Sequence, residues 1–108
     1  MSDVKEISVS DLARKHEAGE DFILLDVREP DELAVASIPW ALAIPMGDVP
    51  VRVDELPKDK PIAVLCHGGT RSGRVTKFLN ENGYPNAVNV AGGIRAWSHE
   101  IDPSVPDY

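Results

Sequence analysis

Residues 61–73 read PIAVLCHGGTRSG, and this stretch decides the fold. It opens with an apolar run that has no polar interruption, which is typical of a strand covered on both faces in a parallel sheet. Cys66 ends the run, and two glycines follow it at once. Val75, Phe78 and Leu79 then recur with the i, i+3, i+4 spacing of an amphipathic helix. The stretch therefore predicts a strand, a tight loop and a helix, with Cys66 at the carboxyl end of the strand.

The rest of the chain continues this alternation of strands and helices. Further apolar runs predict strands at 22–25, 41–44 and 87–90. Helices are expected to begin at Ser8, whose side chain can accept a hydrogen bond from a helix amide, and at Pro30, where a missing N–H costs nothing. The order predicts an α/β fold: a three-layer sandwich with a mostly parallel central sheet flanked by helices.

Length and charge exclude several classes of protein. A chain of 108 residues fits a single domain, 1–108, because two smaller cores would not be stable alone. Eighteen acidic against eleven basic residues give a net charge of −7, which argues against partners such as nucleic acid and anionic membranes. No apolar run approaches the roughly 20 residues that span a bilayer, and the first residues lack the pattern of a signal peptide. We therefore expect a cytoplasmic protein.

Cys66 is the only cysteine, so it cannot form an internal disulfide. The three histidines have no metal-ligand spacing with it, and we expect no metal site. A lone cysteine is commonly a small core residue. Here two glycines, Arg71 and the start of a helix follow it, and converging amides, the helix dipole and the guanidinium all favour a thiolate. The loop therefore favours a reactive nucleophile over a structural cysteine.

Further short sequence motifs precede and follow this loop in the chain. The blocks are LDVREP at 25–30 with Glu32-Leu33, Ile38-Pro39 with Ala41, CHGGTRS at 66–72, and GGI at 92–94 with Ala96-Trp97. With these blocks the chain resembles a single-domain rhodanese, which is a sulfurtransferase module. The loop fits the C-x-x-G-x-R-S form of that family, and the resemblance covers nearly the whole chain.

The resemblance implies a role for each residue of the loop. Cys66 would be the catalytic residue that carries a persulfide, cradled by the amides of residues 67–71, and Arg71 would contact the oxyanion of the sulfur donor. The implied substrate-binding residues are His67, Gly68, Gly69, Thr70 and Arg71, and the supporting residues are Asp26, Arg28 and Ser72. For Asp26 and Arg28, an ion pair or a hydrogen bond that braces the loop is an equally good explanation.

The implied reaction is nucleophilic. The Cys66 thiolate attacks the outer sulfur of thiosulfate or a similar small anionic donor, sulfite leaves, and the persulfide passes its sulfur to a thiophilic acceptor. That acceptor would be cyanide, a thiol or an acceptor protein. The resemblance implies no metal and no organic cofactor. We expect a monomer or a weak dimer.

Two other functions stay open. The related dual-specificity phosphatases have a C-x5-R loop around a phosphate, whereas Cys66 and Arg71 define a C-x4-R loop here. A phosphatase or arsenate reductase is therefore an alternative that the shorter loop disfavours. The other alternative is a carrier or a non-catalytic interaction module, and the intact nucleophile loop disfavours a purely non-catalytic role.

His67 and Trp40 also have more than one interpretation. His67 could be a general base, but adjacent residues seldom point at one another, so we predict a solvent-facing loop histidine. Trp40 stands in the sequence Ser37-Ile-Pro-Trp-Ala41, where the family commonly has glycine. It either marks a contact surface for a partner or fills a local groove, and we favour the groove.

Overall fold

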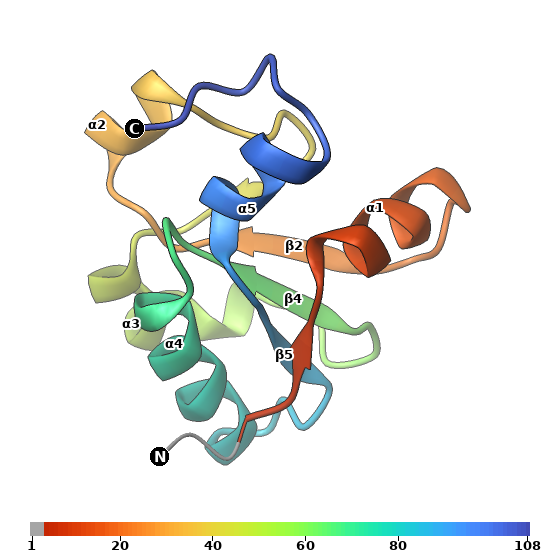
Figure 1. The fold of residues 1–108 in the computed structure, drawn as a ribbon. Helices are drawn as coiled ribbons and strands as arrows, with labels where there is room; N and C mark the ends of the chain where they lie inside the picture. The colour runs from red at the N-terminus through yellow and green to blue at the C-terminus, as the bar shows by residue number, and fades with distance from the viewer. Residues whose placement is uncertain (1–3) are drawn as a thin grey trace.

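Five parallel strands make up the central sheet in the order β1-β5-β4-β2-β3 (Figure 1). The computed structural model describes residues 4–108. The strands are β1 (Glu6–Ile7), β2 (Ile23–Asp26), β3 (Leu42–Ala43), β4 (Ile62–Leu65) and β5 (Ala87–Val90). Each pairing is parallel, so the carboxyl ends of all the strands lie along one edge of the sheet.

Helices cover both faces of this sheet (Figure 1). On one face lie α1 (Val9–Glu17) and α5 (Gly93–Glu100), and on the other lie α3 (Val49–Arg52) and α4 (Thr70–Glu81). The short α2 (Pro30–Val35) follows β2 and lies close to the carboxyl terminus of the chain. Two 3-10 helices, η1 (Met46–Asp48) and η2 (Val53–Glu55), flank α3. In the described part of the chain, no helix has the length and apolar character needed to cross a membrane.

Alternate residues of β4 point into different layers, which explains its continuous apolar run. Ile62 and Val64, together with Cys66 beyond the end of the strand, belong to the core between the sheet and α4. Ala63 and Leu65 belong to the core on the face covered by α1 and α5. A strand buried on both faces needs apolar residues at every position. The predicted three-layer α/β sandwich is confirmed.

The local signals for the first two helices are also confirmed. The Ser8 hydroxyl accepts a hydrogen bond from the Asp11 amide at 3.1 Å and so caps α1. Pro30 occupies the first turn of α2, which begins with a capping box between Glu29 and Glu32. The capping box matters for the site, because it fixes the position of the Glu32 side chain.

Among the described elements, β1 and α5 were not predicted from the sequence. β1 has only two residues and lies at the edge of the sheet, so it has no apolar run to reveal it. α5 begins at Gly93 with Gly92 as its N-cap, and consecutive glycines are typical of a turn rather than of a helix. The predicted strand at 41–44 is shorter than expected, because only Leu42–Ala43 pairs with β2.

Gly93 allows α5 to approach the cysteine loop closely. The amides of Ile94 and Arg95 donate hydrogen bonds to the carbonyl oxygens of Cys66 and His67, at 2.9 and 3.1 Å. A Cβ atom at Gly93 would overlap both of these carbonyl oxygens, and its φ of +60° lies in the left-handed region. Only glycine therefore fits between α5 and the loop.

We expect Gly93→Ala to lower the free energy of unfolding by about 3 kcal/mol, because it combines a left-handed alanine with a clash against two carbonyl groups. Urea denaturation followed by circular dichroism measures this loss. Gly47→Ala is the matched control, since nothing lies within 4 Å of its added Cβ and its φ is not left-handed. Equal losses in the two variants would contradict the role given to Gly93.

Candidate active site

Cys66 lies directly after β4, at the carboxyl edge of the sheet, and is 1% exposed. Its Sγ atom accepts a hydrogen bond from the Gly69 amide at 3.1 Å and one from the Ser72 hydroxyl at 3.2 Å. The residue also belongs to the core beneath α4. The sulfur thus has apolar packing on one side and two polar donors on the other.

The start of α4 supplies further donors next to this sulfur. Gly69 caps the helix with φ of +112°, a conformation that glycine adopts readily. Among the described residues, the amides of Thr70, Arg71 and Ser72 have no hydrogen-bond acceptor. Unpaired amides in the first turn form the positive end of the helix dipole. In the free protein, the direct contacts with Sγ therefore come from one amide and one hydroxyl, and the other amides remain available.

Asn89 of β5 organises the loop from below, and we did not predict it from the sequence. Its Oδ1 accepts a hydrogen bond from the Ser72 hydroxyl at 2.5 Å. Its Nδ2 donates to the Gly69 carbonyl at 3.1 Å and to Glu6 at 3.0 Å. Asn89 is 3% exposed and interrupts the apolar run of β5. This polar residue within a predicted buried strand was the signal that could have revealed its role.

Arg71 does not extend freely over the loop, because Glu32 of α2 holds its guanidinium. The Nη1 and Nη2 atoms of Arg71 donate to the two carboxylate oxygens of Glu32, at 2.7 and 2.8 Å. The paired guanidinium lowers the pKa of Glu32 from 4.5 to about 2. The hydrogen bonds to Glu32 in turn raise the pKa of Arg71 above its usual value, and the charge of Cys66 contributes to this rise. Glu32 stands in one of the blocks that carry the family resemblance, but we predicted no role for it at the site.

Asp26 and Arg28 form a buried ion pair behind the loop. The Arg28 Nη2 atom lies 2.7 Å from Asp26 Oδ2, and both side chains are essentially inaccessible. Arg28 also donates to the Ala36 carbonyl at 2.8 Å and to the Tyr108 hydroxyl at 2.8 Å. The ion pair that we offered as an explanation is therefore present, and it ties β2 to the end of α2 and to Tyr108.

His67 is not the solvent-facing side chain that we predicted. It is half-buried, and its ring stacks on Tyr108 with 4.2 Å between centroids and 17° between planes. Its Nε2 atom is buried and has no hydrogen-bond partner within the described residues. The prediction was wrong because it considered only the loop, whereas Tyr108 returns from the far end of the chain to cover the ring.

Trp40 fills a local groove, as we favoured. Its ring stacks on His16, with 3.8 Å between centroids, and makes edge contacts with Phe22 and Trp97 at 6.0 Å. Trp97 is buried in the core on the α1 and α5 face. Trp40 is therefore a packing residue of that layer.

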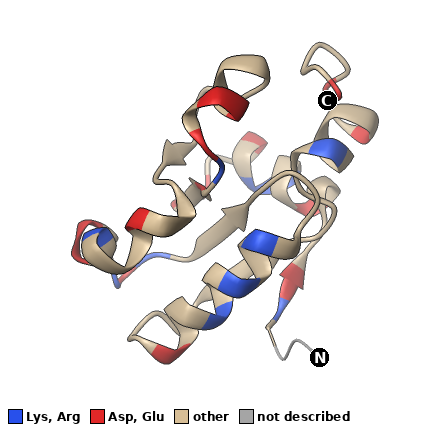
Figure 2. Ribbon diagram, turned by 90° about the vertical axis from the view of Figure 1, so that its left-hand side faces the viewer, with Lys and Arg blue, Asp and Glu red and all other residues tan. Residues whose placement is uncertain are grey.

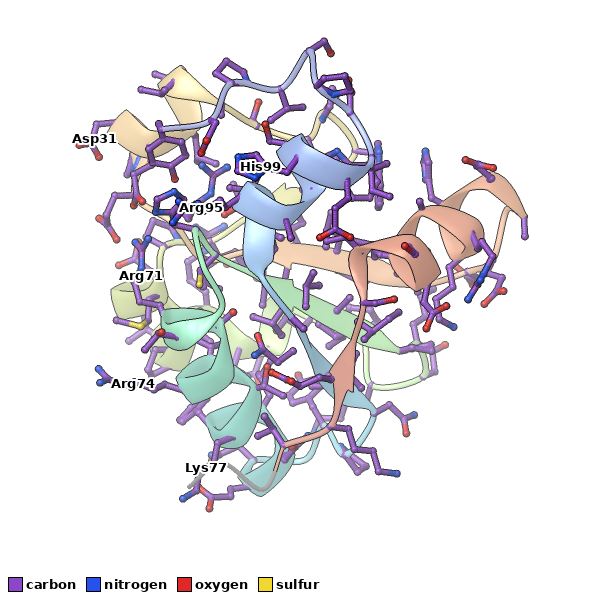
Figure 3. The ribbon with its side chains drawn as sticks, viewed as in Figure 1. Asp31, Arg71, Arg74, Lys77, Arg95 and His99 are labelled. Carbon is purple, nitrogen blue, oxygen red and sulfur yellow. The ribbon has the colours of Figure 1, made fainter. Side chains whose placement is uncertain are left out.

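The remaining predicted residues of the loop lie on the surface. Gly68 and Thr70 are exposed, and Figure 3 shows Arg71 at the end of α4 nearest the loop, with Arg74 and Lys77 further along the helix. Figure 2 shows blue Lys and Arg segments along α4, which ends at Glu81. In the part of the chain that the structure describes, no cluster of His, Cys, Asp and Glu could hold a metal ion.

Replacing Asn89 with alanine should destabilise the loop. We expect the free energy of unfolding to fall by about 2 kcal/mol, since Gly69 and Ser72 each lose a buried hydrogen-bond partner. Chemical denaturation measures the effect. Asn82→Ala is the control, because Asn82 is exposed and its amide donates only to the Phe78 carbonyl. A smaller loss for Asn89 than for Asn82 would contradict this assignment.

The Arg71–Glu32 pair also predicts a pH dependence. Because folding lowers the pKa of Glu32 from 4.5 to about 2, its stabilisation is complete above about pH 4.5 and is lost as the pH falls towards 2. We expect Glu32→Gln to cost about 2 kcal/mol of unfolding free energy at neutral pH and almost nothing near pH 2. Urea denaturation at several pH values tests this. A cost independent of pH would show that the carboxylate charge is not the cause.

Comparison with known proteins identifies the family of the chain. The model of the rhodanese-like domain family matches residues 8–100. The Bacillus subtilis protein YtwF is 46% identical over 101 residues, which cover 94% of this chain and 97% of YtwF. An Allochromatium vinosum protein named sulfurtransferase is 38% identical over 102 residues, covering 94% of this chain and 95% of its own.

A solved structure agrees as well. The crystal structure of a rhodanese-related protein from Thermoplasma volcanium superimposes with a TM-score of 0.82 at 37% sequence identity. The match covers 90% of this chain and 93% of that one. By family match, sequence identity and fold, the chain belongs to the rhodanese-like domain family.

Proposed function

We propose that the protein is a sulfurtransferase that moves a sulfane sulfur through a persulfide on Cys66. The observation that carries the proposal is the pair of hydrogen bonds onto Sγ, from the Gly69 amide and the Ser72 hydroxyl, at the start of α4. A structural cysteine needs neither of these donors. Membership of a family whose Allochromatium vinosum relative is named sulfurtransferase supports the same conclusion.

In the first half-reaction, the Cys66 thiolate attacks the outer sulfur of thiosulfate or a similar donor. A bond forms between Sγ and that sulfur, the S–S bond of the donor breaks, and sulfite leaves with the electron pair. The charge of the product resides on the outer sulfur of the persulfide. The unpaired amides of Thr70, Arg71 and Ser72 are the groups that would receive this charge.

In the second half-reaction, a thiophilic acceptor attacks the outer sulfur of the persulfide and Cys66 leaves as a thiolate. Cyanide, a small thiol or the cysteine of an acceptor protein meets this requirement. The loop stabilises the leaving thiolate with the donors that activate it in the first step, Gly69 and Ser72. Neither half-reaction requires a metal or an organic cofactor. Location in the cytoplasm, the single-domain organisation and the oligomeric state stay predictions.

Phosphate-ester hydrolysis fits the site less well. A phosphatase of this architecture uses its loop arginine for a dianionic phosphate, whereas the Arg71 guanidinium is already engaged by Glu32. The loop is also one residue shorter than the C-x5-R loop of the related phosphatases. Both features favour sulfur transfer.

The experiment that tests the proposal is intact-mass measurement of the protein after incubation with thiosulfate. We expect the mass of one added sulfur atom, its removal by cyanide, and thiocyanate in the solution. Cys66→Ser should gain no sulfur, because a hydroxyl does not attack the donor at neutral pH. Its circular dichroism spectrum controls for folding. Sulfur uptake by the folded Cys66→Ser variant, or none by the unchanged protein with any sulfane donor, would refute the mechanism.

A further inference from the structure

Glu32 cancels the positive charge of the one arginine in the cysteine loop. Both oxygens of its carboxylate bind the Arg71 guanidinium, and the two side chains are 19% and 31% exposed. A guanidinium with a free outer face would attract an anionic donor as a full charge. Paired in this way it still has N–H groups to donate, but its net charge is compensated.

Other contacts keep Glu32 in this position. Its Oε2 atom accepts a hydrogen bond from the Glu29 amide at 2.9 Å, which is half of the capping box of α2. Its Oε1 atom accepts one from the Tyr108 hydroxyl at 3.1 Å. Tyr108 is itself held by Arg28 at 2.8 Å. A donor that enters the site therefore does not simply displace the carboxylate, because two hydrogen bonds besides those to Arg71 would have to break.

Among the described residues, three further arginines lie near the cysteine loop. Arg95 of α5 is exposed, forms no ion pair among those residues and lines a surface pocket with Gly68 (Figure 3). Arg28 is fully buried and paired with Asp26. Arg74 is exposed and forms no ion pair among the described residues, but it lies one helical turn beyond Arg71, roughly 4.5 Å further along α4 (Figure 3). An anion at Cys66 would thus meet the amides of α4, an Arg71 whose charge is compensated and the negative charge of Glu32, while Arg95 lies on the outer surface beside Gly68.

We propose that Glu32 is a specificity-determining residue that makes the Cys66 site favour sulfur donors of low negative charge over dianions such as thiosulfate. The favoured class comprises persulfides and monoanionic thiosulfonates. The inference rests on the proposed sulfur transfer and names the donor class for it. A dianion still reacts, but its second charge gains nothing from the compensated Arg71 and is repelled by Glu32.

A pair of donors that differ in one charge tests the proposal. Thiosulfate and methanethiosulfonate both place a sulfane sulfur on the Cys66 thiolate, and they release sulfite and methanesulfinate with the electron pair of the broken S–S bond. The rate of persulfide formation under excess donor, followed by intact mass, gives a rate constant for each. The ratio of the thiosulfate constant to the methanethiosulfonate constant isolates the effect of the extra charge.

We expect Glu32→Gln to raise this ratio about tenfold, because it frees Arg71 and removes a like charge beside the donor. Glu55→Gln is the matched control. Glu55 also binds an arginine through both oxygens, at 2.9 Å, but its partner Arg52 is not a residue of the cysteine loop. Its ratio should not change. An unchanged ratio in folded Glu32→Gln, or an equal rise in Glu55→Gln, would overturn the proposal.

A second measurement needs no variant. If Arg71 acted as a free cation, salt would screen its attraction for the thiosulfate dianion. The ratio of the thiosulfate to the methanethiosulfonate rate constant would then fall as ionic strength rises. With Glu32 compensating Arg71, we expect a ratio that stays constant or rises. A falling ratio in the unchanged protein would overturn the proposal even if Glu32→Gln failed to fold. If neither donor modified the unchanged protein, the proposed sulfur transfer itself would fail, which is a distinct result.

Discussion

The hydrogen bonds from α5 to the carbonyl groups of Cys66 and His67 are the contact on which the site depends. In a trans peptide the N–H group points opposite to the carbonyl, so fixing these carbonyls against α5 turns the amides of His67 and Gly68 away from that helix. The backbone between β4 and α4 is thereby held in one orientation from below. This requires α5 to touch the loop, and only Gly93 leaves room for that approach.

Fixed dipoles, rather than free charges, surround the sulfur. The protein carries a net charge of −7, and two arginines near the loop are each bound to a carboxylate, Arg28 to Asp26 and Arg71 to Glu32. Within residues 4–108, the unpaired donors next to Cys66 include the amides in the first turn of α4. Backbone dipoles held by a helix do not reorganise when charge moves between sulfur atoms, so they stabilise an anion at low cost. The paired arginines hold the elements around those dipoles in place.

Sequence reasoning predicted the parts of this arrangement that are local in the chain. β4, β2 and β5 follow from apolar runs, and the start of α4 follows from the glycines after Cys66, because each signal lies within a few neighbouring residues. The side chains that contact the loop could not be predicted in this way, because they are far from it in the sequence. Glu32 lies 39 residues from Arg71, and Tyr108 lies 76 residues from Glu32. Such pairs leave no periodicity in the sequence, and only the folded backbone brings them together.

Ser72 links the chemistry at the sulfur to the stability of the loop. Its single hydroxyl proton has two acceptors, Cys66 Sγ at 3.2 Å and Asn89 Oδ1 at 2.5 Å. A thiolate holds its charge on Sγ and attracts this proton, whereas a persulfide holds it on the outer sulfur, about 2 Å away along the S–S bond. The hydroxyl can then return to Asn89, which also binds the Gly69 carbonyl. Sulfur transfer would therefore redirect one O–H group while the backbone of the loop keeps its shape.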